Sequence, residues 1–414
     1  MADYIIPEGY KETSLGVVPE EWEVKQLGDI SNIFSGTTPS RENELFFNGG
    51  VIPWVKTTDL NNGYLTDTEE RITEFALKST TLKIFPKGTV LVAMYGGFNQ
   101  IGRTAILGVN ATINQALSAL VPNNEKIAEY FLLNWLLFKV NKWRRYAASS
   151  RKDPNITKND VLRFPIFVPP LAEQRKIIEV LSICDKVIEK QIQLIEKIEL
   201  RKKGLMQQLL TGKKRLPGFG GEWKNIAIKD FAIEVSLKNN RNENWEVLSC
   251  TKYDGLVPSL QYFGRQVFSK DITQYKIVPQ YCFAYATNHI EEGSIGYQSI
   301  YKNSLISPMY TVFKTDSNMI DDIFLYKLLK SHRAIYLYNV MMEGSIDRRG
   351  GLRWDNFSTI KFLLPDIKEQ SAIADILVSC DNEILLAKQK LNKFRQQKKG
   401  LMQVLLTGKK RVNI

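Results

Sequence analysis

Two long stretches of the chain place apolar residues at alternating steps of four and three. Such steps keep side chains on one side of a helix, and they are typical of helices that wrap around each other. The pattern therefore predicts a long helix with an apolar seam. Eight of the ten seam positions in the first stretch are apolar or Cys, and the ten are Ile177, Leu181, Cys184, Ile188, Gln191, Ile195, Ile198, Lys202, Leu205 and Leu209.

The second stretch repeats the first 196 residues later in the chain. Residues 173–215 and 369–411 align without a gap, with 22 identities in 43 positions. Their ends, KKGLMQQLLTGKKR and KKGLMQVLLTGKKR, differ at a single position. A match of this length indicates an internal duplication, and the nearest partner for each seam is its own duplicate. The second seam consists of Ile373, Leu377, Cys380, Ile384, Ala387, Leu391, Phe394, Lys398, Leu401 and Leu405.

Proline and glycine mark the ends of both predicted helices. Pro169-Pro170 and Pro365 precede them, where proline is tolerated. Gly212 and Gly408 follow them, as is usual for a C-terminal glycine. Each helix then has about 40 residues and a length of about 60 Å. Because a whole globular segment lies between the helices, we expect them to pack antiparallel.

The segments outside the helices alternate short β-branched and aromatic runs with turn residues, as strands do. Examples are VIPWVKTTDL, GTVLVAMYGG and ATINQALSALV in the first segment, and WEVLSCTKYDG, YCFAYAT and LISPMYTVFKT in the second. Pro19 to Trp22 has a looser counterpart in Gly220 to Trp223. The helices have stayed alike while the globular parts have drifted apart.

The predicted fold class is α/β (mixed α+β), with an internal pseudo-two-fold duplication. Two globular domains are separated by two long antiparallel coiled-coil helices. The predicted division is 1–168 for the first globular domain, 169–212 for the first long helix, 213–364 for the second globular domain, and 365–414 for the second long helix with a basic tail.

Composition adds information about partners. The net charge of +12 and the pI of about 9.3 favour a negatively charged partner. Nucleic acid is the leading candidate and an acidic membrane surface the second, while a merely soluble basic protein stays an alternative. The N-terminus MADYIIPEGY does not resemble a signal peptide, and no apolar run is long enough for a membrane helix, so we expect a cytoplasmic protein. Four cysteines without a C-x-x-C motif predict neither a disulfide framework nor a zinc site.

Several motifs resemble the specificity subunit of type I restriction-modification enzymes. They are SSRKDPNITKNDVLRFPIFVPPLAEQRKI (149–177), WVKTTDL (54–60), MYGGFNQIGRTAI (94–106), TINQALSAL (112–120) and the KKGLMQQLLTGKKR helix end. The resemblance covers essentially the full chain. In the second half, SIDRRGGLRWDN (345–356) departs from the SRK-x-x-x-I pattern of residues 150–156.

The resemblance implies a division of roles between this chain and its partners. Each globular domain is a target-recognition domain and reads one half of a bipartite, asymmetric site on double-stranded DNA. The helices set the spacer between the half-sites and dock two methyltransferase subunits, which bind S-adenosylmethionine and methylate adenine. A restriction/translocase subunit joins that core for cleavage.

Motifs for catalysis are missing from the sequence. It has no N-P-P-F or D-P-P-Y motif, no G-x-G-x-x-G opening a helix after a strand, and no Walker A motif. The D/E-x-K triplets at 23–25 and 366–368 are common by chance in a chain with 24% charged residues. His289 and His332 are single histidines without a predicted orienting partner. We therefore predict no catalytic, cofactor-binding or metal-binding residue. A coiled-coil protein scaffold that does not bind DNA stays the alternative function.

Candidate DNA contacts are polar and basic residues in predicted loops, because such side chains bind phosphates and base edges. The basic runs 213–215 and 409–411 either bind phosphate or offset the helix dipole. The candidates in the first domain are Lys56, Thr57, Thr58, Asn99, Gln100, Arg103, Ser149, Arg151 and Lys152, and those in the second are Lys252, Tyr253, Asn288, His289, Arg348, Arg349 and Arg353.

Overall fold

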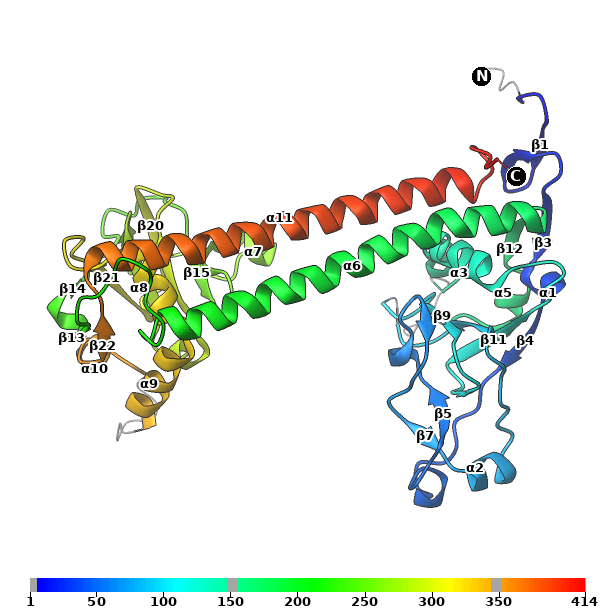
Figure 1. Ribbon diagram of the computed structural model, residues 1–414, viewed down its shortest axis with the longest axis horizontal. Coiled ribbons are helices and arrows are strands. Elements are labelled where there is room, and N and C mark those ends of the chain that lie inside the picture. The colour runs from blue at the N-terminus through cyan, green and yellow to red at the C-terminus, as the bar shows by residue number, and fades with distance from the viewer. Residues whose placement is uncertain (1–5, 98, 148–154, 344–350, 414) are drawn as a thin grey trace. The chain divides into compact units, whose positions relative to one another are not determined.

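The computed structural model describes residues 6–97, 99–147, 155–343 and 351–413. The chain folds into two compact units, which are described separately here. Unit 1 comprises Met1–Gln191 and Lys390–Ile414, and unit 2 comprises Ile192–Gln389. Two 39-residue helices, α6 (Leu171–Leu209) and α11 (Ile367–Leu405), each contribute to both units (Figure 1). The compact units thus cut through the long helices, whereas the division predicted from the sequence kept each helix whole.

Both long helices begin and end where the sequence predicts. α6 begins at the residue after Pro170, and α11 begins two residues after Pro365. Each helix ends three residues before its glycine. Gly212 and Gly408 both adopt a φ of +69°, the left-handed conformation that glycine reaches at low cost. A Cβ at Gly212 would lie 3.2 Å from the Trp223 ring, and a Cβ at Gly408 would lie 2.4 Å from the Pro19 ring, with Trp22 3.4 Å away.

The head of unit 1 is built on a five-stranded sheet with the order β4-β11-β8-β9-β6. A smaller sheet has the order β10-β5-β7, and the 3-10 turns η1 and η2 precede and follow β5 in the chain. The strand β12, which leads into α6, pairs with β3. The elements of this head are β1 (Tyr10–Thr13), β2 (Gly16–Pro19), β3 (Glu23–Gln26), α1 (Leu27–Ile30), β4 (Ser31–Ser35), η1 (Glu44–Phe46), β5 (Ile52–Val55), η2 (Thr57–Asp59), β6 (Tyr64–Leu65), β7 (Arg71–Ile72), α2 (Glu74–Ser79), β8 (Val90–Ala93), β9 (Thr104–Leu107), β10 (Thr112–Ile113), β11 (Leu117–Pro122), α3 (Glu129–Phe138), α4 (Val140–Ala147), α5 (Lys158–Leu162) and β12 (Pro165–Val168).

The head of unit 2 is built on a four-stranded antiparallel sheet with the order β14-β21-β18-β19. Here β22 pairs with β13 immediately before α11. The elements are β13 (Lys224–Ala227), η3 (Ile228–Asp230), β14 (Ala232–Glu234), β15 (Leu248–Thr251), β16 (Gly255–Pro258), α7 (Ser259–Phe263), β17 (Lys276–Pro279), β18 (Cys282–Ala286), η4 (Ile290–Glu292), β19 (Ile295–Gln298), β20 (Asn303–Ile306), β21 (Tyr310–Thr315), α8 (Asp322–Leu329), α9 (His332–Glu343), α10 (Trp354–Phe357) and β22 (Lys361–Leu364).

The two heads share one architecture. The strand order β4-β11-β8-β9 of the first head corresponds to β14-β21-β18-β19 of the second. In each head an apolar helix, α3 or α8, follows the sheet, and its Phe-Leu pair (Phe131-Leu132 or Phe324-Leu325) is fully buried. The predicted duplication and the mixed α+β class are therefore confirmed.

The long helices pair through the predicted seams. Every seam position is buried or partly buried. In unit 1 the beginning of α6 packs on the end of α11, with Ile177 and Leu181 in one core with Leu405. In unit 2 the end of α6 packs on the beginning of α11, with Leu209 in one core with Leu377. The predicted antiparallel pairing is confirmed.

The duplication keeps a lysine at one seam position of each helix, Lys202 in α6 and Lys398 in α11. Each lysine forms an ion pair with an aspartate of the other helix. Lys398 Nζ contacts both carboxylate oxygens of Asp185 at 2.6 and 2.8 Å, within unit 1. Lys202 is ion-paired with Asp381, within unit 2. A third residue from the adjacent head joins each pair: Tyr130 donates to Asp185, and Lys327 contacts Asp381.

A buried glutamate at the beginning of each helix is held by a tryptophan and an arginine. We call the group Trp22, Glu173 and Arg411 the first clasp, and the group Trp223, Glu369 and Arg215 the second clasp. Glu173 and Glu369 are 0% exposed. Trp22 Nε1 donates to Glu173 at 2.9 Å, and Arg411 donates two hydrogen bonds to its two oxygens at 2.6 and 3.0 Å.

The second clasp has the same geometry. Trp223 Nε1 donates to Glu369 at 3.1 Å, and Arg215 donates two hydrogen bonds of 2.7 Å. In both clasps the arginine follows the end of one long helix, and the glutamate begins the other. These arginines therefore bind carboxylates in this structure, and phosphate contact by the lysines of the two basic runs stays a prediction.

The next residue in each helix anchors the head. Gln174 accepts a hydrogen bond from the Ala128 N–H at 2.9 Å and donates to the carbonyl oxygens of Lys126 and Pro169. Gln370 accepts from the Asp321 N–H at 2.8 Å and donates to the carbonyl oxygens of Met319 and Pro365. The repeated Glu-Gln pair thus joins each helix to its partner helix and to its own head.

We predict that Arg411→Ala destabilises unit 1, because it leaves Glu173 buried without its cation. The expected loss is about 2 kcal/mol of unfolding free energy, since the arginine is partly exposed. Guanidinium denaturation followed by tryptophan fluorescence measures it, and Trp22 reports directly on the clasp. Lys409→Ala, at an exposed position two residues earlier, is the matched control. Equal stability of the two variants would contradict the clasp.

Candidate nucleic-acid interface

The first head brings two groups of predicted DNA contacts together. Asn99, Gln100 and Arg103 lie in the loop between β8 and β9. The Arg103 guanidinium donates to Gln100 Oε1 at 2.8 Å and to the carbonyl oxygen of Leu60, which directly follows η2. Arg103 therefore ties the β8–β9 loop to the η2 turn that carries Thr57 and Thr58, and the exposed side chains of Asn99 and Thr58 lie on these two tied segments.

Lys56 is held by carboxylates in this structure. Its Nζ lies 2.8 Å from Glu69 and 2.5 Å from Glu70, and its side chain is only 19% exposed. Hydrogen bonds to Glu69 and then Glu70 raise the pKa of Lys56. Contact with a phosphate would require these ion pairs to break. Lys56 therefore has a structural role in this head, and its contact with DNA stays a prediction.

Five predicted contacts lie outside the described residues, namely Ser149, Arg151, Lys152, Arg348 and Arg349. In both heads, the chain just after these positions is held by one main-chain hydrogen bond, which we call the anchor. The Ile156 N–H donates to the Met94 carbonyl at 3.0 Å, and the Leu352 N–H donates to the Thr287 carbonyl at 2.9 Å. Ile156 and Leu352 are 196 residues apart, so the anchor is shared although the second head lacks the SRK pattern.

A polar cavity of about 460 Å³ lies beside the anchor of the second head. Asn288 and Arg353, two predicted contacts from distant parts of the sequence, line it together with Thr287 and Trp354. Gly351 adopts a φ of +64°, and a Cβ there would lie 2.3 Å from Asn288 Oδ1 and 2.6 Å from the Thr287 carbonyl oxygen. Only glycine permits this close approach, which places Arg353 beside Asn288.

Lys252 and Tyr253 lie next to each other in unit 2, and Tyr253 lines a second cavity there. They form the turn between β15 and β16, and the Tyr253 side chain is 82% exposed. Lys330 Nζ donates to the carbonyl oxygen of Lys252 at 3.0 Å. Tyr253 lines a cavity of about 1120 Å³ whose walls are rich in cations, including Lys202, Lys203, Lys213, Lys330, Arg333 and Lys388.

Burial and ion pairing shape the charges in this basic cavity. Burial lowers the pKa of Lys330. Burial alone would raise the pKa of Asp381, but hydrogen bonds from Lys202 and Lys327 lower it overall. The carboxylate thus stays ionised and offsets part of the positive charge on this wall of the cavity.

Apart from Lys213, which belongs to the basic run 213–215, sequence reasoning missed the basic residues of this cavity. Lys202 occupies a seam position and Lys330 ends α8, so neither lies in a predicted loop. A second missed group lies in unit 1, where Lys139, Lys142 and Arg145 line a cavity of about 580 Å³ on α3 and α4. Burial lowers the pKa of both lysines. The regular spacing of three residues between Lys139, Lys142 and Arg145 is the feature of the sequence that could have identified this basic group.

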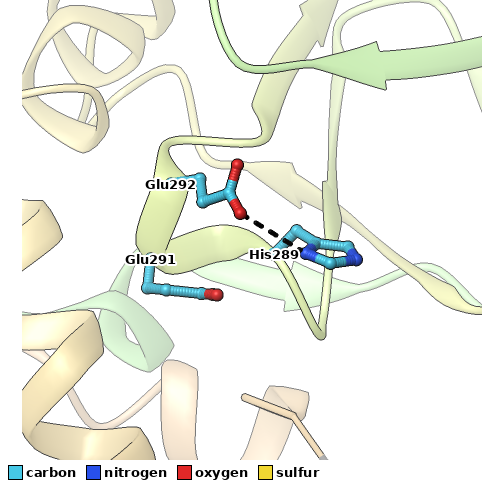
Figure 2. Close-up of side chains that lie close together, drawn as sticks. All are labelled: His289, Glu291 and Glu292. Carbon is cyan, nitrogen blue, oxygen red and sulfur yellow. Dashed lines mark ion pairs between the residues drawn. The ribbon is translucent and has the colours of Figure 1, made fainter. Parts of the chain in front are cut away.

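Among the residues that the structure describes, one group has the side chains of a metal site. His289, Glu291 and Glu292 place one potential ligand atom each within 4.8 Å of one another. Figure 2 shows His289 and Glu292 facing each other across the turn η4, with His289 Nδ1 3.8 Å from Glu292 Oε1. Two of the three side chains are exposed, and His289 and Glu292 are placed to form an ion pair with each other. We therefore assign no metal ion to this group.

No helix in the described part of the chain combines the length and the apolar character that a membrane span requires.

Fold and loops together define the class of protein. Two heads with one architecture gather different polar and basic side chains around equivalent loops, and a duplicated helical frame carries them. This is the design of a bipartite recognition subunit.

A family comparison gives that class its identity. The model of the type I restriction modification DNA specificity domain matches residues 19–200 and, a second time, residues 221–396. The chain therefore belongs to the family of type I restriction-modification DNA specificity proteins, with one specificity domain in each half.

Individual relatives agree with this assignment. The putative type I restriction enzyme MjaX specificity subunit of Methanocaldococcus jannaschii is 26% identical, and the match covers 98% of this chain and 97% of the relative. The MjaIX specificity subunit of the same organism is 35% identical, but that match spans only 46% of this chain and 45% of the relative.

Two solved structures share the fold at low sequence identity. The type I restriction-modification S subunit from M. genitalium has a TM-score of 0.54 at 15% identity, over 93% of this chain and 96% of that chain. A chain from a study of complex assembly and conformational transition of the type I R-M system has a TM-score of 0.61 at 14% identity, over 94% of this chain and 99% of that chain.

We predict that Gly351→Ala disrupts the polar cavity of the second head. Alanine in a left-handed conformation costs about 1–2 kcal/mol by itself. At Gly351 it must also displace the Thr287–Asn288 backbone, so the Leu352 amide should lose its protection from hydrogen exchange. Gly264→Ala is the matched control, because Gly264 has the same φ of +64° and open space around its Cβ position. Equal protection of Leu352 in both variants would contradict the anchor.

Proposed function

We propose that this chain selects the DNA sequence on which a type I restriction-modification enzyme acts. Each head reads one half of a bipartite, asymmetric site. The long helices set the spacer between the half-sites and dock two methyltransferase subunits. The observation that carries the proposal is the anchor that both heads share, because it presents unlike side chains from equivalent loops.

Unlike loops on a common architecture suit the reading of two different half-sites. Asparagine, glutamine and arginine side chains distinguish base edges in the major groove, whereas lysine and arginine bind phosphates without regard to sequence. The first head presents Asn99 and Gln100, and the second presents Asn288 and Arg353. The basic cavities of the two units supply candidates for phosphate contact.

Catalysis belongs to the partners in this proposal. The methyltransferase subunits bind S-adenosylmethionine and transfer the methyl group, and a restriction/translocase subunit cleaves DNA. In the D/E-x-K triplet at 366–368, Asp366 accepts a hydrogen bond from the Glu369 N–H at 2.9 Å at the start of α11. In the triplet at 23–25, Glu23 is ion-paired with Lys25 at 3.2 Å on β3. The two cation-lined cavities support a DNA ligand, because lysine and arginine bind phosphates.

We predict that Asn288→Ala combined with Arg353→Ala alters recognition of one half-site only. Loss of a bidentate base contact costs about 1–3 kcal/mol. Methylome sequencing of a host that carries the complete system should show relaxed or lost methylation at one half-site and an unchanged second half-site. Lys224→Ala, at an exposed position of the same head, is the control. A methylome identical to that of the wild type would contradict the assignment, and a host without this subunit should show no methylation at the site.

We also predict that residues 1–216 pair with a second copy of themselves. The seam of α6 then packs on its own symmetry mate, and Arg215 takes the place of Arg411 on Glu173. With methyltransferase present, the pair should methylate a palindrome made from the first half-site. Light scattering measures the pairing, and residues 1–212, which lack Arg215, should pair more weakly. An unstable monomer would contradict the equivalence of the two clasps.

A further inference from the structure

The polar cavity of the second head contains charges of both signs that do not neutralise each other. Glu234 of β14 lines it together with Arg353 and Asp355, which lie at the start of α10, and all three residues are exposed. None of their three charged groups has an ion-pair or hydrogen-bond partner among the residues that the structure describes. Opposite charges that share a cavity without pairing are available to a ligand that presents both acceptors and donors.

The basic cavity of unit 2 treats its carboxylates differently. Glu199 is ion-paired with Lys388 at 2.7 Å, and Asp381 is ion-paired with Lys202 and Lys327. These pairs remove negative charge from a wall that is rich in cations, as a phosphate ligand requires. A free carboxylate repels phosphate, so the polar cavity of the second head suits base edges instead.

Arg353 stands where the local structure favours another residue. It is the N-cap of α10, and its side chain makes no capping hydrogen bond. The N-cap of α5 in the first head is Thr157, whose hydroxyl accepts from the Asp160 N–H at 3.2 Å. Threonine is favoured at this position because its oxygen can accept such a bond, whereas a guanidinium has no acceptor. A residue that breaks a local rule without a compensating contact marks a functional position.

The first head lacks both charges of this pair. At the offset of 196 residues, Arg353 corresponds to Thr157 and Asp355 to Asn159. Both short helices nevertheless follow the same main-chain anchor. The guanidinium and the carboxylate are therefore specific to the second head, as is expected of side chains that read only one of two different half-sites.

A G·C base pair presents the complementary pattern in the major groove. Guanine offers its N7 and O6 acceptors to an arginine, and cytosine offers its N4 amino group to a carboxylate. An A·T pair opposes both contacts, because adenine carries an amino donor where guanine carries O6, and thymine carries an O4 acceptor where cytosine carries its donor. An arginine and a carboxylate side by side therefore select G·C through both strands.

We propose that Arg353 and Asp355 read one G·C base pair in the half-site of the second head, with Arg353 bound to guanine and Asp355 accepting a hydrogen bond from cytosine. The inference rests on the proposed function. We assign the cytosine contact to Asp355 because the same short helix carries it and Arg353, whereas Glu234 belongs to the edge strand β14.

The test is competition binding by the full chain in complex with its methyltransferase subunits. Each base pair of both half-sites is replaced in turn in a set of DNA duplexes. Arg353→Thr should weaken binding of the unaltered site about tenfold or more and should abolish the preference for guanine at one position. Asp355→Asn should accept A·T at that same position about fivefold better than the wild type does. Effects at two different positions would overturn the inference.

A salt series separates base reading from phosphate contact. If Arg353 binds a phosphate, Arg353→Thr weakens all duplexes equally and lowers the slope of log affinity against log salt by about 0.9. That result would overturn the inference. Glu234→Gln should keep the wild-type base preference. A position relaxed in Glu234→Gln but not in Asp355→Asn would overturn the assignment of the cytosine contact.

The Arg353→Thr variant also separates recognition from folding. Threonine can cap α10, so the free variant should melt at or above the temperature of the wild type. Arg265→Thr is the matched control, because it removes an exposed arginine of the same head that does not line the cavity, and it should keep the base preference. Loss of the preference in both variants would overturn the inference.

The wild-type complex distinguishes the two levels of the proposal. A half-site of the second head without any G·C pair would overturn this inference and leave the proposed function standing. A wild-type complex that binds every duplex equally would overturn the proposed function itself.

Discussion

A carboxylate buried at the beginning of each long helix is the constraint on which this structure depends. Glu173 and Glu369 are fully inaccessible, and a buried charge is tolerated only when it is paired and hydrogen-bonded. The required arginine never comes from the same helix: Arg411 pairs with Glu173, and Arg215 pairs with Glu369. Each copy of the repeat can therefore bury its first turn only when the tail of the other copy is in place.

The attachment of the heads explains how they could diverge while the helices stayed alike. Gln174 and Gln370 bind the heads through main-chain groups, including the Ala128 N–H and the Asp321 N–H. Every residue except proline offers such a donor, so the head sequence can change without loss of the contact. The anchor between Leu352 and Thr287 is likewise a main-chain hydrogen bond. Side chains around both anchors are thus left free to be selected for recognition.

Where side chains do join head and helix, the two copies use different chemistry. Asp185 and Asp381 both pair with a seam lysine, but the third partner is Tyr130 in unit 1 and Lys327 in unit 2. Burial, together with the bond to Asp185, raises the pKa of the Tyr130 hydroxyl well above its usual range, whereas Asp381 has its pKa lowered overall. The same division appears elsewhere on the helices, where Ile183 and Val187 of α6 correspond to Ser379 and Glu383 of α11. A symmetric frame thereby carries two unequal surfaces.

The sequence by itself determined the frame. Steps of four and three, the prolines before and glycines after each helix, and the offset of 196 residues fix both helices and their antiparallel pairing, because these are local patterns that repeat. Tertiary structure alone decided what meets at the candidate site. It tied Arg103 to Leu60, placed Arg353 beside Asn288, committed Lys56 to two glutamates, and gathered Lys202 and Lys330 around one cavity. These contacts join residues between 13 and 128 positions apart, and no periodicity in the chain encodes pairings at such separations.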